Sequence, residues 1–272
     1  MRSLILTAEN KTMARIYPLF SSSKANSTFI GDSRGGILID AGASFKRMTE
    51  AFQKSSLPLS AIQAVFITHS HSDHVSGLKM LTKKTGIPVF GQEKTLEELL
   101  KKELIAPCSE VYSLDDAAAA ADMEISCFDT PHDTVQSCGY RIKTSDGRVC
   151  AVCTDLGHVT QTVEENLYGC DLVLLEANYD EKMLANGIYP YYLKERIRSD
   201  HGHLSNNASA AQAEKLVRNG TTRLILGHLS QDNNTPYIAD KTVEKGLKGL
   251  VRGRDYLLEV APVETTGKMT VF

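Results

Sequence analysis

The sequence predicts an α/β protein in which two β-sheets pack together and helices cover their outer faces. The chain has 272 residues, of which 42% are hydrophobic, so it can bury a sizeable core. Short apolar, β-branched runs dominate the first third, and strands and helices then alternate. Because no repeat, low-complexity segment or linker divides the sequence, we expect a single domain over residues 14–272. Residues 1–13 form an N-terminal extension of uncertain order.

The first third of the chain is predicted to form strands and a helix. Apolar, β-branched runs separated by Ser, Asn and Gly favour strands. Phe45, Met48 and Phe52 recur at helical spacing, which predicts a helix over residues 44–55. The strands expected in this part of the chain cover residues 14–20, 27–32, 35–42 and 61–69.

Helices and strands alternate in the rest of the chain. Gly86 and Gly220 follow helical patterns and are expected to end them, because glycine readily adopts the left-handed conformation found after many helices. The expected helices cover residues 74–86, 93–104 and 206–220. The expected strands cover residues 87–91, 171–180 and 222–230, with a turn that leads into a strand over 115–133 and a hairpin over 137–155.

Composition limits the possible partners and locations of the protein. The net charge is −3 at pH 7, so nothing indicates disorder or a broadly basic nucleic-acid-binding surface. No apolar run approaches the roughly 20 residues that span a membrane. The apolar run at residues 4–6 is too short for a secretory signal. We therefore expect a cytoplasmic protein without a membrane partner, and the oligomeric state stays open.

The six cysteines are scattered through strand-like or apolar segments. Cys150 and Cys153 form the pattern CAVC, which is compatible with a redox pair or a zinc site. However, this pattern lies in a run typical of a buried strand, where residues three apart face opposite sides. We therefore expect buried, unreactive thiols without disulfides.

The segment ITHSHSDHVSG, residues 67–77, is the densest group of metal-ligand side chains. In an extended loop, side chains two apart point the same way, so His69 and His71 can bind one ion together. Asp73 and His74 follow where the chain turns into a helix, which directs them to a second point nearby. Because strand ends converge at one edge of a sheet, three further residues that end predicted strands can join them. These are His132, Asp155 and His228.

The order of these motifs resembles that of the metallo-β-lactamase superfamily, from Asp40 to His228. The resemblance implies a four-layered αβ/βα sandwich that holds two divalent metal ions. Imidazole and carboxylate ligands without cysteine suit Zn²⁺, Mn²⁺ or Fe²⁺. Asp40, in LIDAG, matches a family aspartate that supports the first metal-binding loop. The resemblance assigns one ion to His69, His71 and His132, and the other to Asp73, His74 and His228, with Asp155 bridging both.

Such a centre implies hydrolytic chemistry. Two neighbouring ions share a water, lower its pKa toward about 7 and hold the resulting hydroxide as the nucleophile. We count Asp73 among the catalytic residues, because its loss should inactivate the centre. A phosphodiester also needs an acid for its leaving alkoxide. His203 is the candidate, because its loop and helix lead directly to His228, and because this segment resembles a loop of tRNase Z in which a histidine acts in phosphodiester cleavage.

A more specific resemblance, from Arg15 onward, is to the YycJ/WalJ group of this superfamily. It is carried by SSSKANST, TDLGHVT, LEANYD, NGIYPYYLKERIRSDHGHLSN and HLSQDNNTP. The resemblance implies a cytoplasmic exonuclease that degrades double-stranded DNA from the 5′ end. The N-terminal loop departs from the group, because Lys24 and Ala25 replace flexible glycines. This departure puts the conformation of the loop in doubt, and Lys24 could add a cation near the site.

Several residues are candidates for substrate contacts. Ser205 and Asn206 are natural N-cap residues of the helix that they open, and a helix N-terminus can also hold a phosphate. His158 is compatible with a substrate contact, a supporting role or simple surface exposure. Basic side chains near residues 194–198 and 241–254 could bind DNA, but acidic neighbours dilute both groups. The candidates are Lys24, Asn26, His158, Ser205 and Asn206.

Four functions fit parts of this pattern. The leading hypothesis is a dinuclear phosphodiesterase, a DNA exonuclease with DNA as its partner. The alternative is a small-molecule hydrolase of the same fold that acts on a cyclic phosphodiester, lactone or thioester, which the acidic charge balance favours. A redox di-iron protein would need a carboxylate at His71 and a flavin domain. A non-catalytic metal-binding module would be expected to lack some ligands, whereas the full set is present.

Overall fold

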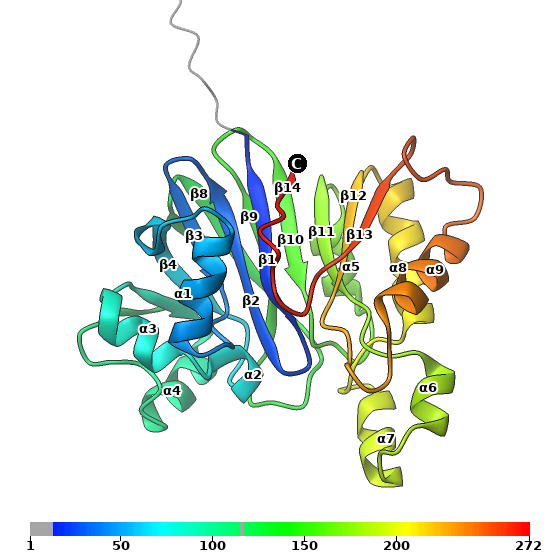
Figure 1. The fold of residues 1–272 in the computed structure, drawn as a ribbon, viewed down its shortest axis with the longest axis horizontal. Coiled ribbons are helices and arrows are strands. Elements are labelled where there is room, and N and C mark those ends of the chain that lie inside the picture. The colour runs from blue at the N-terminus through cyan, green and yellow to red at the C-terminus, as the bar shows by residue number, and fades with distance from the viewer. Residues whose placement is uncertain (1–12, 115–116) are drawn as a thin grey trace, which may run out of the picture.

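The computed structural model describes residues 13–114 and 117–272. Two seven-stranded sheets face each other, and helices cover the outer face of each sheet (Figure 1). The chain therefore has the αβ/βα sandwich expected from its sequence. Of the expected extension over residues 1–13, all but Met13 lies outside the described residues.

The first sheet comes mainly from the N-terminal half of the chain. Strands β1 to β3 are antiparallel, whereas β3 to β6 run parallel. The parallel strands all end at one edge of the sheet. In order across the sheet, the strands are β14 (Thr270–Val271), β1 (Arg15–Ser22), β2 (Ala25–Asp32), β3 (Gly35–Ile39), β4 (Ile62–Ile67), β5 (Val89–Gly91) and β6 (Val111–Ser113).

The second sheet has the same mixed character. Strands β7 to β10 are antiparallel, and β10 to β13 run parallel. In order across the sheet, the strands are β13 (Leu257–Val260), β12 (Arg223–Gly227), β11 (Leu172–Glu176), β10 (Val149–Cys153), β9 (Cys138–Lys143), β8 (Met123–Asp129) and β7 (Ala117–Ala120).

Helices lie on both outer faces and at one end of the sandwich (Figure 1). None of the described helices is long and apolar enough to cross a membrane. On the first sheet they are α1 (Phe45–Lys54), α2 (Ser72–Val75), α3 (Leu78–Thr85) and α4 (Glu93–Lys101), with the 3₁₀ turn Leu59–Ala61 before β4. On the second sheet they are α5 (Gln161–Leu167), α8 (Asn206–Arg218) and α9 (Pro236–Gly246), and α6 (Glu181–Asn186) and α7 (Tyr191–Arg198) project beyond it.

Three layers of buried side chains hold together the two sheets and the helices on their outer faces. The central layer lies between the sheets and includes Ile37, Phe66 and Tyr140, all fully buried. A second layer packs α1 to α4 against the first sheet, and a third packs α5, α8 and α9 against the second sheet. Because both faces of each sheet are covered, the central strands are apolar almost throughout.

The helix predicted over residues 74–86 is divided into α2 and α3. Gly77 lies at the break, and its backbone amide donates to the carbonyl oxygen of Ala41 (2.8 Å). This contact with the loop after β3 replaces a helical hydrogen bond and redirects the chain. Gly86 ends α3 in the left-handed conformation, as predicted.

The prediction for residues 115–133 was wrong at its start. Residues 117–120 form β7, where a turn was expected, and they pair with β8 in a hairpin. The turn lies instead at Ala121 and Asp122, both in the left-handed region with φ of 53° and 56°. An alanine run contains no turn signal, so only the pairing with β8 specifies this strand.

The CAVC cysteines lie on β10 and face opposite sides of the second sheet. Cys150 packs into the central layer, whereas Cys153 packs against the helices of the second sheet. Both thiols are buried and free, and burial raises the pKa of each. The interpretation of these two thiols as buried is therefore confirmed, and their lack of reactivity stays a prediction.

Candidate metal centre

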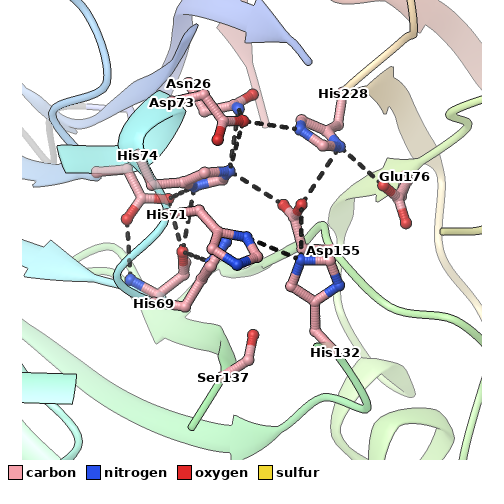
Figure 2. A network of polar contacts seen from close by, with 12 residues as sticks. Asn26, His69, His71, Asp73, His74, His132, Ser137, Asp155, Glu176 and His228 are labelled. Carbon is pink, nitrogen blue, oxygen red and sulfur yellow. Dashed lines mark hydrogen bonds and ion pairs between the residues drawn. The ribbon is translucent and has the colours of Figure 1, made fainter. Parts of the chain in front are cut away.

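Ligand-type side chains gather at the edge where the parallel strands of both sheets end (Figure 2). His69 follows β4, Asp155 follows β10 and His228 follows β12. The adjacent ends of these strands therefore bring together residues that are far apart in the sequence. His71, Asp73 and His74 come from the loop and helix α2 after β4, and His132 comes from the loop after β8.

Three of the site residues have left-handed backbones. The φ angles are 61° at Asp40, 59° at Asp155 and 55° at His228. This conformation costs a non-glycine residue on the order of 1 kcal/mol, so it persists only where the surrounding fold imposes it. Each of these residues stands at or just beyond the end of a parallel strand, where the sharp turn directs its side chain toward the cluster.

His69, His71 and His132 form the first group of potential ligands. Their ring nitrogens lie within 4.8 Å of one another, and His132 Nε2 is 3.3 Å from His71 Nδ1. His132 donates from Nδ1 to the carbonyl oxygen of Gly202 (3.1 Å), which leaves Nε2 free to bind an ion. The resemblance assigned these three histidines to one ion, and the structure brings them together.

Asp73, His74 and His228 form the second group. Asp73 Oδ2 is 3.3 Å from His74 Nε2 and 3.4 Å from His228 Nε2. Asp155 stands between the two groups, since its Oδ2 is 3.2 Å from His74 Nε2 and its Oδ1 is 3.6 Å from His132 Nε2 (Figure 2). This is the position that a bridging carboxylate would need.

The cluster fits divalent metal ions. His69 Nε2 is buried and has no hydrogen-bond partner among the described residues. Leaving such an atom unsatisfied costs about 1–3 kcal/mol, which a bound cation would remove. All the converging ligand atoms are imidazole nitrogens or carboxylate oxygens, a set suited to Zn²⁺ or Mn²⁺.

Asp40 supports the metal-binding loop from behind. Its Oδ1 accepts a hydrogen bond from the backbone amide of Thr68, and its Oδ2 accepts one from the Thr68 hydroxyl, both at 2.8 Å. The same Oδ2 lies 2.7 Å from Nδ1 of His74. A proton on that nitrogen leaves His74 Nε2 to face the cluster, so Asp40 sets the orientation of this ring, as its match to the family aspartate implied.

Glu176 is a site residue that the sequence analysis missed. It is fully buried at the end of β11, and its Oε1 lies 2.8 Å from Nδ1 of both His203 and His228. Its Oε2 accepts from the backbone amides of Leu156 and Leu204. Despite burial, the two histidines lower the pKa of Glu176 to about 2. The sequence signal that could have identified Glu176 is its position at the end of the apolar run LVLLE, because several of the identified ligands also stand at the ends of strands.

The two groups of ligands differ in their charge. Burial lowers the pKa of His69 well below its usual value, with a further contribution from His74, and burial also lowers the pKa of His132. Both rings are therefore neutral at pH 7, which is the form that binds a metal ion.

The second group carries charge of both signs. Burial opposes protonation of His74 and His228, but Asp155 leads the carboxylates that raise the pKa of both, that of His228 to about 10. Burial likewise opposes ionisation of Asp73 and Asp155, yet these two imidazoles lower the pKa of both carboxyls. A metal ion at this position would therefore replace protons on the imidazoles.

A groove with a volume of about 830 Å³ opens beside His71 and His132. Glu98 and Asp133 line it, as does Lys102. Arg196 pairs with Asp133 at its rim. The carboxylates of Glu98 and Asp133 offset the positive charges of Lys102 and Arg196. A polyanion would therefore have to be attracted to this groove by bound metal ions. The full lining is Ser70, His71, Glu98, Lys102, His132, Asp133, Thr134, Val135 and His201.

The N-terminal loop contains two of the proposed substrate-contact residues. Lys24 is exposed in the turn between β1 and β2, and neither it nor Ala25 has a positive φ. The turn therefore has no need of the glycines that these residues replace. Asn26 is buried, with its amide nitrogen 3.0 Å from His74 Nε2 and 3.2 Å from Asp73 Oδ2. It adjoins the second group of ligands.

The remaining candidates lie around the start of α8. Ser205 caps this helix by accepting from the amide of Ala208 (3.2 Å). Asn206 is only 1% exposed and exchanges two hydrogen bonds with Asn234, so it has no free surface for a substrate, and its proposed contact was wrong. His158 is exposed, with Nδ1 2.9 Å from the carbonyl oxygen of Asp200.

Comparison with known proteins agrees with this geometry. A family model described as a β-lactamase superfamily domain matches residues 36–229. The chain is 32% identical over 232 residues to exodeoxyribonuclease YycJ of Bacillus anthracis, which covers 85% of this chain and 88% of that protein. It is also 32% identical over 229 residues to exodeoxyribonuclease WalJ of Streptococcus pneumoniae, covering 83% and 85% respectively.

A solved structure supports the same architecture. The metallo-β-lactamase fold protein YhfI from Bacillus subtilis matches with a TM-score of 0.73 and 17% identity, over 96% of this chain and 99% of that one. At this level of identity, the match concerns the fold alone.

Proposed function

This chain belongs to the β-lactamase superfamily and, within it, to the YycJ/WalJ group, and we propose from that premise that it is a dinuclear phosphodiesterase that degrades double-stranded DNA from the 5′ end. As a member of a superfamily of metal-dependent hydrolases, it is an enzyme of that class. The observation that supports the narrower proposal is the contact of His203, a histidine beside the cluster, with the buried carboxylate of Glu176.

The first ion would be held by His69, His71 and His132, and the second by Asp73, His74 and His228, with Asp155 shared. When bound, the ions supply Lewis-acid activation of water and of the phosphoryl oxygens. Asp40 and Glu176 fix the rings of His74 and His228 from behind, so that these ligands need little rearrangement.

His203 is a better candidate for proton transfer than for metal binding. Its side chain is 21% exposed, and its Nδ1 lies 2.8 Å from Glu176 Oε1 and 3.8 Å from Asp155 Oδ1. The hydrogen bond to Glu176 occupies Nδ1 and leaves Nε2 of the ring free to face a substrate. Nε2 can then donate a proton to the leaving oxygen of a phosphodiester.

A small-molecule hydrolase of the same fold is the second candidate. It is favoured by the groove beside His71, where Glu98 and Asp133 offset the positive charges. A small phosphodiester, lactone or thioester would not meet the repulsion that these carboxylates present to a polyanion.

The test uses the purified protein loaded with Mn²⁺ or with Zn²⁺. DNA duplexes labelled at the 5′ or the 3′ end and bis-p-nitrophenyl phosphate are incubated with the wild type, His203→Ala and Asp73→Ala. We expect stepwise digestion from the 5′ end that His203→Ala slows strongly and Asp73→Ala abolishes. Intact DNA together with hydrolysis of the small ester would contradict the exonuclease and favour the second candidate.

A further inference from the structure

Helices α6 and α7 form a projection that the sandwich does not need for its core. They lie between β11 and α8 and extend beyond the sheets, at the same end of the molecule as α2 (Figure 1). Helix α7 has no buried residue, and α6 buries only Leu184. Packing within the core therefore does not explain why the chain maintains this projection.

The projection exposes large apolar side chains next to one another in the sequence. Ile188 is 93% exposed, Tyr191 is 76% exposed and Tyr192 is 75% exposed. Their neighbour Tyr189 behaves differently, because it is half-buried and donates from its hydroxyl to Asp232 (2.7 Å). We call Tyr191 and Tyr192, on the first turn of α7, the tyrosine pair.

Helix α7 connects the tyrosine pair to the metal centre. Near its other end, Arg196 pairs with Asp133, the neighbour of His132. The carbonyl oxygen of Ile197 accepts from the backbone amide of His203 (2.9 Å). The tyrosine pair is four to five residues from Arg196, which is about 7 Å along a helix axis.

The chemistry of α7 fits single-stranded nucleic acid better than a protein partner. A stable protein interface buries about 800 Å² on each side, whereas a tyrosine contributes at most about 150–250 Å². Aromatic rings that stack on unpaired bases need no larger surface. Lys194, Arg196 and Arg198 follow the tyrosine pair on the same helix. Arg196 pairs with Asp133 and Arg198 with Glu195, which leaves Lys194 as the cation of this helix whose charge no carboxylate of the described residues offsets.

We propose that the tyrosine pair stacks on unpaired bases of the DNA strand whose phosphodiester lies at the metal centre. This inference rests on the proposed function and specifies how the substrate is held. Stacking there would stabilise a frayed duplex end and keep the cleaved strand apart from its complement.

The test compares the ratio of kcat/KM for DNA to that for bis-p-nitrophenyl phosphate in metal-loaded full-length variants. Tyr191→Ala with Tyr192→Ala should lower this ratio about 5- to 150-fold, since stacking on one base contributes about 1–3 kcal/mol. The Phe pair keeps the rings and should retain the ratio, whereas the Leu pair keeps only apolar surface and should lose it. Tyr237→Ala, on α9, is the matched control at another exposed tyrosine, and melting curves check that each variant folds.

The outcomes separate this inference from the function on which it rests. If the wild type does not digest DNA, the proposed function fails and the stacking role fails with it. If the wild type digests DNA and the Ala pair has an unchanged ratio, the stacking role alone is overturned. A retained ratio in the Leu pair, or an equal loss in the Phe and Ala pairs, would also overturn stacking. A loss of the ratio in the Ala and Leu pairs but not in the Phe pair supports it.

Discussion

A single carboxylate, Glu176, holds the proposed acid and one metal ligand at the same time. Glu176→Gln keeps the size of the side chain but removes the carboxylate charge that lies 2.8 Å from Nδ1 of His203. We expect kcat on DNA to fall about 100-fold or more, the range of general acid catalysis. Hydrolysis of bis-p-nitrophenyl phosphate should fall much less, because its leaving group departs as a stable anion.

The metal content of Glu176→Gln distinguishes two explanations for its expected loss of activity: weaker acid catalysis by His203, or weaker binding of the second ion. Glu176 also contacts His228, so the loss of its charge could weaken the second ion. If Glu176→Gln keeps its metal and loses activity equally on both substrates, the acid role of His203 is contradicted. His203→Ala is the comparison, because it removes the proposed acid and leaves the Glu176 contact with His228 in place.

The charges of the second group predict that metal binding releases protons. His74 and His228 have raised pKa values, that of His228 about 10, so both are protonated at pH 7 in the metal-free protein. Each must lose its proton to bind an ion. We therefore expect proton release on metal binding at pH 7, and an affinity that rises with pH until about 10. Titration calorimetry in two buffers of different ionisation enthalpy measures the release, and equal heats in both would contradict the prediction.

At the scale of elements, two loops approach each other closely to form the second group. A Cβ atom added to Gly42 would lie 1.7 Å from the carbonyl oxygen of Asp73. This oxygen belongs to the backbone, which cannot move aside as a flexible side chain can. Gly42→Ala should therefore push the loop after β3 away from α2. We expect it to lower the free energy of unfolding by about 1–3 kcal/mol, as overpacking does, and to weaken metal binding.

Gly91→Ala is the matched control for this substitution. A Cβ there meets the flexible end of Leu96 at 3.3 Å, so a small side-chain movement accommodates it. Denaturant unfolding of the two variants, each loaded with metal, gives the comparison. Equal stabilities would show that the approach of the two loops does not constrain the fold.

The elements were predictable wherever their own residues specify them. The helix that became α1 and the strand that became β4 follow from apolar periodicity alone. Strand β7 and the break at Gly77 do not, because each depends on a partner elsewhere in the chain, namely β8 and the loop after β3. Tertiary contacts thus decided the segments in which the local signal was weak.

At the scale of the whole molecule, the candidate ligands were predictable because their positions follow two simple rules. Spacing within one loop groups His69 with His71, and convergence of strand ends adds Asp155 and His228. The partners of these residues were not predictable in the same way. Asn206, for example, is buried against Asn234. This contact depends on how α8 packs in the folded chain, which the local sequence does not specify.

The metal centre also joins the two halves of the sandwich. His69 and Asp73 follow the first sheet, whereas Asp155 and His228 follow the second, so bound ions would link the sheets at one edge. An ion that binds only the folded state at 100 times its Kd adds about 2.7 kcal/mol of stability. For a chain of this size, that corresponds to about 5–10 °C in Tm. We expect a chelator to lower the Tm of the wild type by at least this amount and to leave Asp73→Ala nearly unaffected, in scans of both proteins with metal and with chelator. An unchanged wild-type Tm after the metal has been removed would mean that the fold holds the two sheets together without the ions.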